Sequence, residues 1–86
     1  MMNRTILEDI AEERGLPLLF ADGFDDAIIG LASYRGSNQV VYSTEKCLDI
    51  LANDMSYEEA IEFFSYNVEG AYLGDHTPIF IETRSE

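Results

Sequence analysis

Positive charge is scarce in this chain, which carries five lysine and arginine residues against seventeen aspartates and glutamates. The formal net charge is -12 at pH 7. Such an excess of negative charge repels the phosphates of nucleic acids and the anionic headgroups of membranes. We therefore predict that the chain binds neither nucleic acid directly nor a membrane surface.

Cysteine and long apolar runs are also lacking. Cys47 is the only cysteine, so no intramolecular disulfide can form, which suits a reducing compartment. The longest apolar runs, such as residues 27–32, fall well short of the roughly 20 residues that span a bilayer, and no signal-like segment opens the sequence. The default expectation is a cytosolic protein.

Motifs that carry chemistry are missing as well. One cysteine and one histidine cannot form a zinc pattern, and the sequence contains neither a phosphate-binding P-loop nor a dinucleotide fingerprint. We therefore predict no catalytic residue, no cofactor site and no metal site. Cys47 falls on the apolar stripe of a predicted helix, which is typical of a buried small hydrophobic residue rather than of a reactive thiolate.

Two polar clusters keep a different function open. His76 stands beside Asp75 in a predicted turn, where a carboxylate could hold it as a general base, although a polar turn residue or a hydrogen-bond donor at a strand end is the commoner role. Asp22, Asp25 and Asp26 crowd carboxylates near Gly23, but their spacing departs from that of a calcium loop. The alternative hypothesis is a small hydrolase, or a ligand- or metal-binding protein, that uses Asp75, His76 and the Asp22–Asp26 turn.

The remaining sequence is that of one folded domain over residues 1–86, since 47% of its residues are hydrophobic. Apolar residues at helical spacing predict a first helix around residues 6–11 that stops at Gly15 and Pro17. Residues 27–34 carry no charge, which predicts a strand buried on both faces. A turn at residues 35–38 and β-branched residues at 39–42 complete a hairpin.

The second half of the chain predicts two more helices and a strand. Ser43 or Thr44 can cap a helix that ends before Asn53, and Ser56 with Glu59 has the spacing of a capping box. In the helix that follows, apolar residues share one predicted core face and Gly70 is the expected stop; they are Tyr57, Ala60, Ile61, Phe64 and Val68. Residues 79–81 form a last strand.

These elements predict an α+β fold with the order α-β-β-α-α-β. The expected sheet is small and mainly antiparallel, with three or four strands. The second and third helices should cover it, and the first helix should pack at one edge.

Three segments and their order resemble a group of small proteins encoded mainly by tailed bacteriophages. They are DGFDDAIIG at 22–30, VVYSTEKCLDIL at 40–51 and MSYEEAIEFFSYNVEGAYLGDHTPIF at 55–80. The resemblance spans most of the chain, and the last segment is its most specific part. It implies a role in the cytoplasm of an infected host bacterium, in host takeover, and it assigns no activity or site.

The third predicted helix carries a candidate partner surface. Phe63 and Tyr66 project away from the predicted core face, beside Glu59 and Glu62. Aromatic side chains dominate the energetics of protein interfaces, so these four residues are predicted to bind a partner protein or a second copy of the chain. The alternative is that another segment covers the two rings.

Rows of carboxylates on the first and third helices also admit two interpretations. Glu58, Glu62 and Glu69, with Glu8 and Glu12, either form solvated faces or present charge where the phosphates of DNA would lie. The leading hypothesis is a non-catalytic phage accessory protein. It would bind a host protein through this acidic and aromatic surface and inhibit a host defence enzyme or nucleic-acid enzyme.

Overall fold

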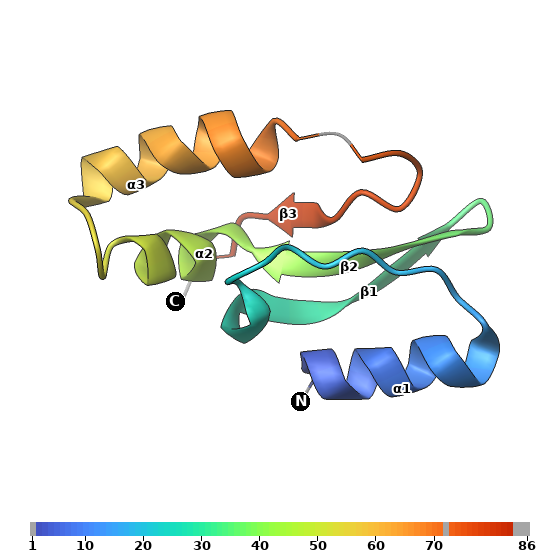
Figure 1. The fold of residues 1–86 in the computed structure, drawn as a ribbon. Helices are drawn as coiled ribbons and strands as arrows, with labels where there is room; N and C mark the ends of the chain where they lie inside the picture. Colours follow the sequence, from blue (N-terminus) through green and yellow to red (C-terminus); the bar gives the residue numbers. More distant parts are fainter. Residues whose placement is uncertain (1, 72, 84–86) are drawn as a thin grey trace.

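The computed structural model describes residues 2–71 and 73–83, in which the chain forms three α-helices and a three-stranded sheet (Figure 1). In chain order the elements are α1 (Arg4–Arg14), a 3-10 turn η1 (Asp25–Ala27), β1 (Ile28–Tyr34), β2 (Ser37–Ser43), α2 (Thr44–Leu51), α3 (Tyr57–Phe64), a π-helical turn η2 (Ser65–Glu69) and β3 (Ile79–Ile81). The predicted α+β class and element order are confirmed.

The sheet has the order β1-β2-β3 and is mixed. β1 and β2 pair antiparallel across a two-residue turn, in which Arg35 and Gly36 have φ of 52° and 83°. Two successive positive φ angles are typical of a type I′ turn. β3 runs parallel to β2. The connection through α2 and α3 carries the chain back along the sheet before β3 begins, so that β3 runs in the same direction as β2. The antiparallel prediction thus holds for β1 and β2 only.

The prediction that residues 27–34 are buried on both faces is wrong. β1 lies at an edge of the sheet, and Ile28 is its only buried residue, whereas Ile29 and Tyr34 are exposed. The pairing with β2 shifts between Ile28 and Gly30, so Ile29 is the extra residue of a β-bulge. The absence of charge in this segment therefore has a cause other than burial.

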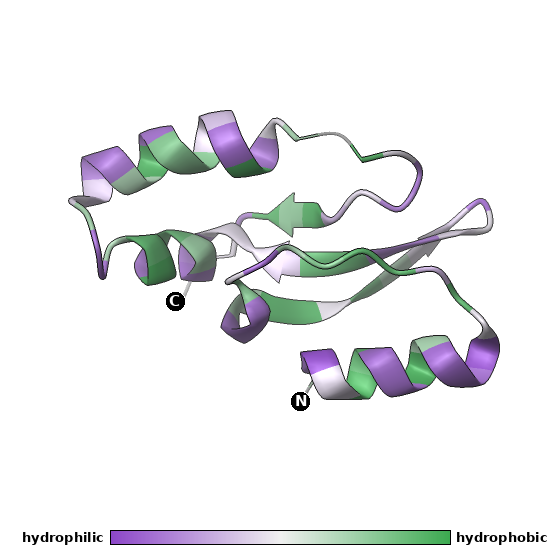
Figure 2. Cartoon of the chain, in the orientation of Figure 1, coloured by the Kyte–Doolittle hydropathy of each residue, from purple (hydrophilic) through white to green (hydrophobic). Residues whose placement is uncertain are grey.

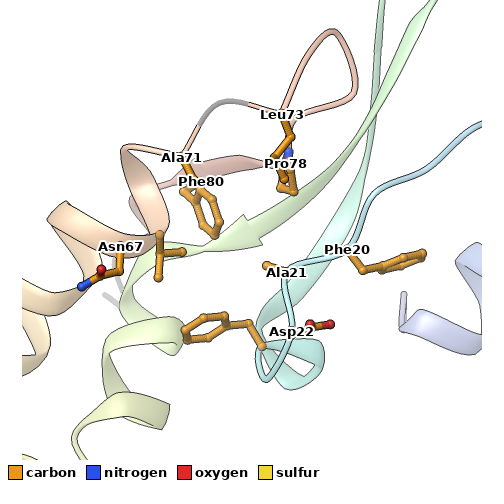
Figure 3. A pocket seen from close by; sticks show the side chains of 10 residues that line it. Phe20, Ala21, Asp22, Asn67, Ala71, Leu73, Pro78 and Phe80 are labelled. Atoms are coloured by element: carbon orange, nitrogen blue, oxygen red, sulfur yellow. The ribbon is translucent and has the colours of Figure 1, made fainter.

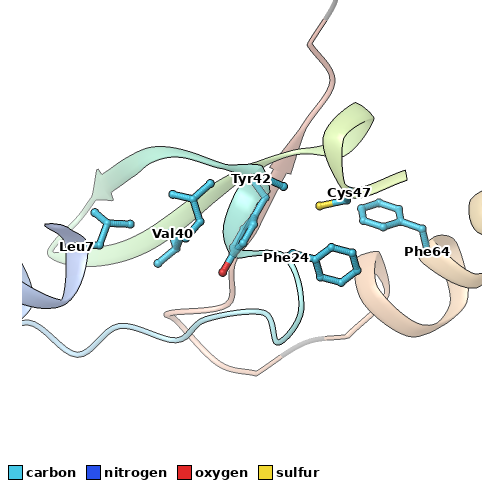
Figure 4. Packing of buried hydrophobic residues seen from close by; sticks show 8 residues of the cluster. Leu7, Phe24, Val40, Tyr42, Cys47 and Phe64 are labelled. Atoms are coloured by element: carbon cyan, nitrogen blue, oxygen red, sulfur yellow. The ribbon is translucent and has the colours of Figure 1, made fainter. Parts of the chain in front are cut away.

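The hydrophobic core lies on one face of the sheet. β2 contributes Val40 and Tyr42, which are fully buried. The three helices contribute one buried residue each to the same cluster, Leu7 from α1, Cys47 from α2 and Phe64 from α3 (Figure 4). All three helices therefore belong to the layer on this face, with α1 on the β1 side (Figure 1).

Aromatic contacts join the central strand to its neighbours. The ring of Tyr42 stacks on Phe80 of β3 with centroids 5.3 Å apart, and Phe64 meets Phe80 edge-on at 5.2 Å. The Tyr42 hydroxyl accepts a hydrogen bond of 2.7 Å from the backbone N–H of Ala21. Tyr42 thus fixes the segment that leads into η1 as well as the last strand.

Side-chain caps explain where the helices begin and end. The Asn3 side chain accepts from the N–H of Ile6, and Gly15 ends α1 in the left-handed region with φ of 65°. Of the two predicted caps of α2, Ser43 is the one used, accepting from the N–H of Lys46 at 3.2 Å. No helix in the described part of the chain has both the length and the apolar character that a membrane span requires.

The core face of α3 is narrower than predicted. Ala60 and Phe64 are buried, but Tyr57 is 54% and Ile61 43% exposed. The reason is that α3 packs on α2 and contacts Phe80 of the sheet through Phe64, which leaves the flank with Tyr57 and Ile61 exposed among the described elements. After Phe64 the helix widens into η2 and ends at the expected Gly70.

We expect the cap and the core of α3 to differ in their contributions to stability. Ser56→Ala removes an N-cap acceptor and should lower the free energy of unfolding by about 1 kcal/mol. Phe64→Ala empties a buried site against Phe80 and should lower it by about 3–5 kcal/mol. Urea denaturation followed by circular dichroism measures both; equal losses would contradict the packing described for α3.

Candidate functional site

A capping box sets the orientation of the acidic side of α3. The Ser56 hydroxyl accepts from the N–H of Glu59 at 3.2 Å, and the Glu59 carboxylate accepts from the N–H of Ser56 at 3.0 Å, as the sequence predicted. The backbone hydrogen bond from Ser56 lowers the pKa of the Glu59 carboxyl group below its usual value. Glu59 is therefore a structural residue of the helix start as well as a surface charge.

An open depression of about 350 Å³ lies along the outer side of α3. We call its lining the α3 outer surface; it comprises Met55, Glu59, Glu62, Phe63, Tyr66 and Asn67. Phe63 is 41% and Tyr66 79% exposed, so no described segment covers the two rings. The four residues predicted to bind a partner thus lie together on one surface.

Two residues of the α3 outer surface were missed by the sequence analysis. Met55 directly precedes Ser56, the N-cap of α3, so its place next to the predicted capping box was a usable signal. Asn67 is brought in by η2, where its side-chain amide donates to the carbonyl of Phe63 at 3.2 Å. π-helical turns are frequent at functional sites, but a single sequence has no clear pattern for them.

A second cavity, of about 270 Å³, opens between the segment before η1 and the segment that follows α3 (Figure 3). Its lining is largely apolar and includes Phe20, Phe24, Val68, Leu73 and Phe80. Asp22 also borders it.

Asp75 and His76 lie outside both cavities, in the turn before β3. The carbonyl of Asp75 accepts from the side-chain amide of Gln39 at 2.7 Å, and the Nδ1 of His76 lies 3.1 Å from the carbonyl oxygen of Asn38. An Nδ1–H tautomer of His76 donates to this carbonyl. Both contacts tie the turn to β2, in keeping with a hydrogen-bond donor beside a strand end.

One carboxylate of the Asp22–Asp26 turn, that of Asp25, contacts α1. Asp25 forms an ion pair with Arg4 at 3.3 Å, and the Arg4 guanidinium lies 4.4 Å from the centroid of the Phe20 ring. Arg4 also pairs with Glu8 at 3.5 Å. Within residues 2–71 and 73–83, no group of three or more His, Cys, Asp or Glu side chains is arranged to hold a metal ion.

Cys47 is fully buried in the core, as its position on the helix stripe predicted. Burial penalises the thiolate and raises the pKa of the Cys47 thiol to about 12. At neutral pH the group is therefore a protonated thiol that functions as a small hydrophobic side chain.

Comparison with known proteins finds no family model, no curated protein and no solved structure that matches this chain.

The buried thiol predicts a loss of stability in alkali. Its pKa in the folded state lies above that of the unfolded chain, so the unfolded chain loses its proton first and stability falls as pH rises from about 9 towards 12. Each pH unit in that window costs about 1.4 kcal/mol. Burial raises the pKa of Tyr42 as well, which adds to the decline.

Cys47→Ala should lower stability at pH 7 by about 1 kcal/mol through the small cavity left, yet reduce the decline between pH 9 and 11. Urea denaturation at each pH measures both effects. Equal declines in the variant and the parent chain would show that the thiol does not cause the alkaline loss.

Proposed function

We propose that this chain is a non-catalytic binding protein that engages another protein through the α3 outer surface. The observation that carries the proposal is the exposure of Phe63 and Tyr66 beside Glu59 and Glu62 around one depression. Buried aromatic anchors contribute most of the energy of many interfaces, and an exposed pair beside a hollow suits that role.

The charge of the chain favours a basic partner surface. Glu58, Glu62 and Glu69 are exposed on α3 and η2, and a net charge of -12 attracts positively charged sites at long range. Enzymes that act on nucleic acids present such sites to phosphates. Together with the resemblance to tailed-phage proteins, this supports a host defence enzyme or nucleic-acid enzyme as the partner, and inhibition in the host cytoplasm as the outcome of binding.

A ligand-binding role is the second candidate, and the apolar cavity beside Asp22 is the observation that favours it. Asp22 belongs to the turn named in the alternative hypothesis, whereas Asp75 and His76 do not border this cavity. A ligand in this cavity would therefore be held mainly by apolar contacts, with one carboxylate at its border.

Replacing both aromatic residues should weaken partner binding while the fold survives. We expect Phe63→Ser with Tyr66→Ser to weaken binding to a protein captured from bacterial lysate by about 2–4 kcal/mol, because both rings are exposed anchors. The matched control is Tyr57→Ser with Ile61→Ser, which removes two exposed apolar residues of the same helix outside the depression. Capture is quantified by mass spectrometry, and circular dichroism monitors folding. Equal binding by both double variants would contradict the proposal.

Neutralising one carboxylate should change the rate of association more than the lifetime of the complex. Glu62→Gln is the suitable variant, because a change at Glu59 would also disrupt the capping box. We expect slower association and a weaker dependence on salt, since charges at the rim of an interface steer encounter. Surface plasmon resonance at several salt concentrations measures both, with Glu45→Gln on α2 as the control away from the α3 outer surface. A change confined to the dissociation rate would show that Glu62 acts as an anchor instead.

A further inference from the structure

One arginine of the chain is held by an aromatic ring and two carboxylates. The guanidinium of Arg4 lies over the ring of Phe20, 4.4 Å from its centroid, and pairs with Asp25 at 3.3 Å and with Glu8 at 3.5 Å. A planar guanidinium can stack on a ring and donate hydrogen bonds to carboxylates at the same time. This cluster shows which side chains of the chain together hold an arginine.

The α3 outer surface combines the same groups without a basic residue of its own. Phe63 and Tyr66 supply exposed rings, and Glu59 and Glu62 supply carboxylates around the same depression. Figure 2 shows hydrophilic residues among hydrophobic ones along α3. The basic residues that the structure describes stand elsewhere, on α1, in the turn between β1 and β2, and on α2. The negative charge of the depression is therefore not neutralised by any of them.

The polar groups of the depression are mainly hydrogen-bond acceptors. The Glu59 carboxylate accepts from the N–H of Ser56 through Oε1, which leaves Oε2 for a ligand. Within the described residues, the exposed Glu62 forms no ion pair. The Asn67 amide nitrogen donates to the carbonyl of Phe63 at 3.2 Å, so its Oδ1 remains as an acceptor. Such a set suits a ligand that has many donors and no acceptor, as a guanidinium has.

We propose that the depression of the α3 outer surface receives an arginine side chain of the partner protein, with its guanidinium over one of the two rings and paired with Glu62. The inference rests on the proposed function, because it names the group of the partner that this surface binds. Arginine is favoured over lysine, since a guanidinium is flat, weakly hydrated and stacks on rings, whereas an ammonium is a compact and strongly hydrated charge.

NMR titration of the isotope-labelled chain with the peptide acetyl-Gly-Arg-Gly-amide tests the proposal. At physiological salt, the backbone amide signals of residues 55–67 should shift in a saturable way. The peptide should bind about fivefold more tightly than one with citrulline, which keeps the shape of arginine but carries no charge. Two outcomes would overturn the proposal. They are equally tight binding of acetyl-Gly-Lys-Gly-amide, and shifts as large at Glu12 and Glu13 of α1 as on α3, which would indicate general attraction to negative charge.

Two double variants test the role of the rings. Phe63→Ser with Tyr66→Ser should abolish the saturable shifts, because it removes the stacking surface. Tyr57→Ser with Ile61→Ser is the matched control and should leave the affinity for the arginine peptide unchanged, since both residues are exposed on α3 outside the depression. Glu62→Gln should weaken binding by only about two- to fourfold, since exposed ion pairs contribute little.

A third double variant separates aromatic character from apolar surface. Phe63→Leu with Tyr66→Leu keeps large apolar side chains but lacks the rings, and it should weaken the arginine peptide by about threefold. Circular dichroism reports whether each variant folds, and this milder variant remains decisive if the serine variant does not fold. Unchanged affinity of the leucine variant would show that the rings do not stack on the guanidinium and would overturn the proposal.

Capture of a partner protein distinguishes this inference from the proposed function. If Phe63→Ser with Tyr66→Ser loses the partner while the parent chain does not bind the arginine peptide, the surface binds protein through another group and the arginine inference is wrong. If that variant captures the partner as well as its control does, the proposed function is wrong, whereas the peptide titration still decides whether the depression binds a guanidinium. The arginine peptide, and not the citrulline peptide, should also displace a captured partner.

Discussion

The contacts of Tyr42 are the interaction on which the rest of the fold depends. Its ring lies between the central strand and Phe80 of β3, and its hydroxyl accepts from the N–H of Ala21 in the segment that leads to η1. The buried Tyr42 hydroxyl needs a hydrogen-bond partner, and the backbone N–H of Ala21 supplies it. One side chain thus holds together three parts of the chain that lie far apart in sequence. Phe64 joins the same aromatic group and positions α3, whose outer side carries the candidate site.

The negative charge is unevenly distributed over the surface, so that some regions are crowded with carboxylates and others carry no charge. Among the residues that the structure describes, the carboxylates are exposed and lie outside the strands. A surface crowded with carboxylates favours basic partners, whereas an uncharged apolar surface favours one that is apolar itself. The α3 outer surface, with Glu59 and Glu62, is of the first kind.

Local signals in the sequence were sufficient where structure depends on near neighbours. The capping box of Ser56 and Glu59 predicts the start of α3, and the spacing of Phe63 and Tyr66 predicts that they leave the core face together. Tertiary packing decided the rest. A strand without charged residues, such as β1, can be buried or can be apolar and exposed. The lack of charge alone does not distinguish the two cases. The width of the α3 core face depends on how closely α2 and the sheet approach the helix. Helical spacing alone placed Tyr57 on this core face, although its side chain is exposed. The direction of β3 follows from the path through two helices.

The parallel pairing of β3 with β2 also has a consequence for the order of folding. The β1–β2 hairpin and α2 are contiguous in sequence and can form from local contacts. β3 pairs with β2 across more than thirty intervening residues, because Val41 is the partner of Ile79. During synthesis the ring of Tyr42 lacks the ring of Phe80, on which it stacks, until β3 has been added, and Val40 and Tyr42 belong to a core that is still incomplete. A nascent chain that pauses before β3 would therefore present the free edge of β2 to other chains, and rapid completion of β3 protects it.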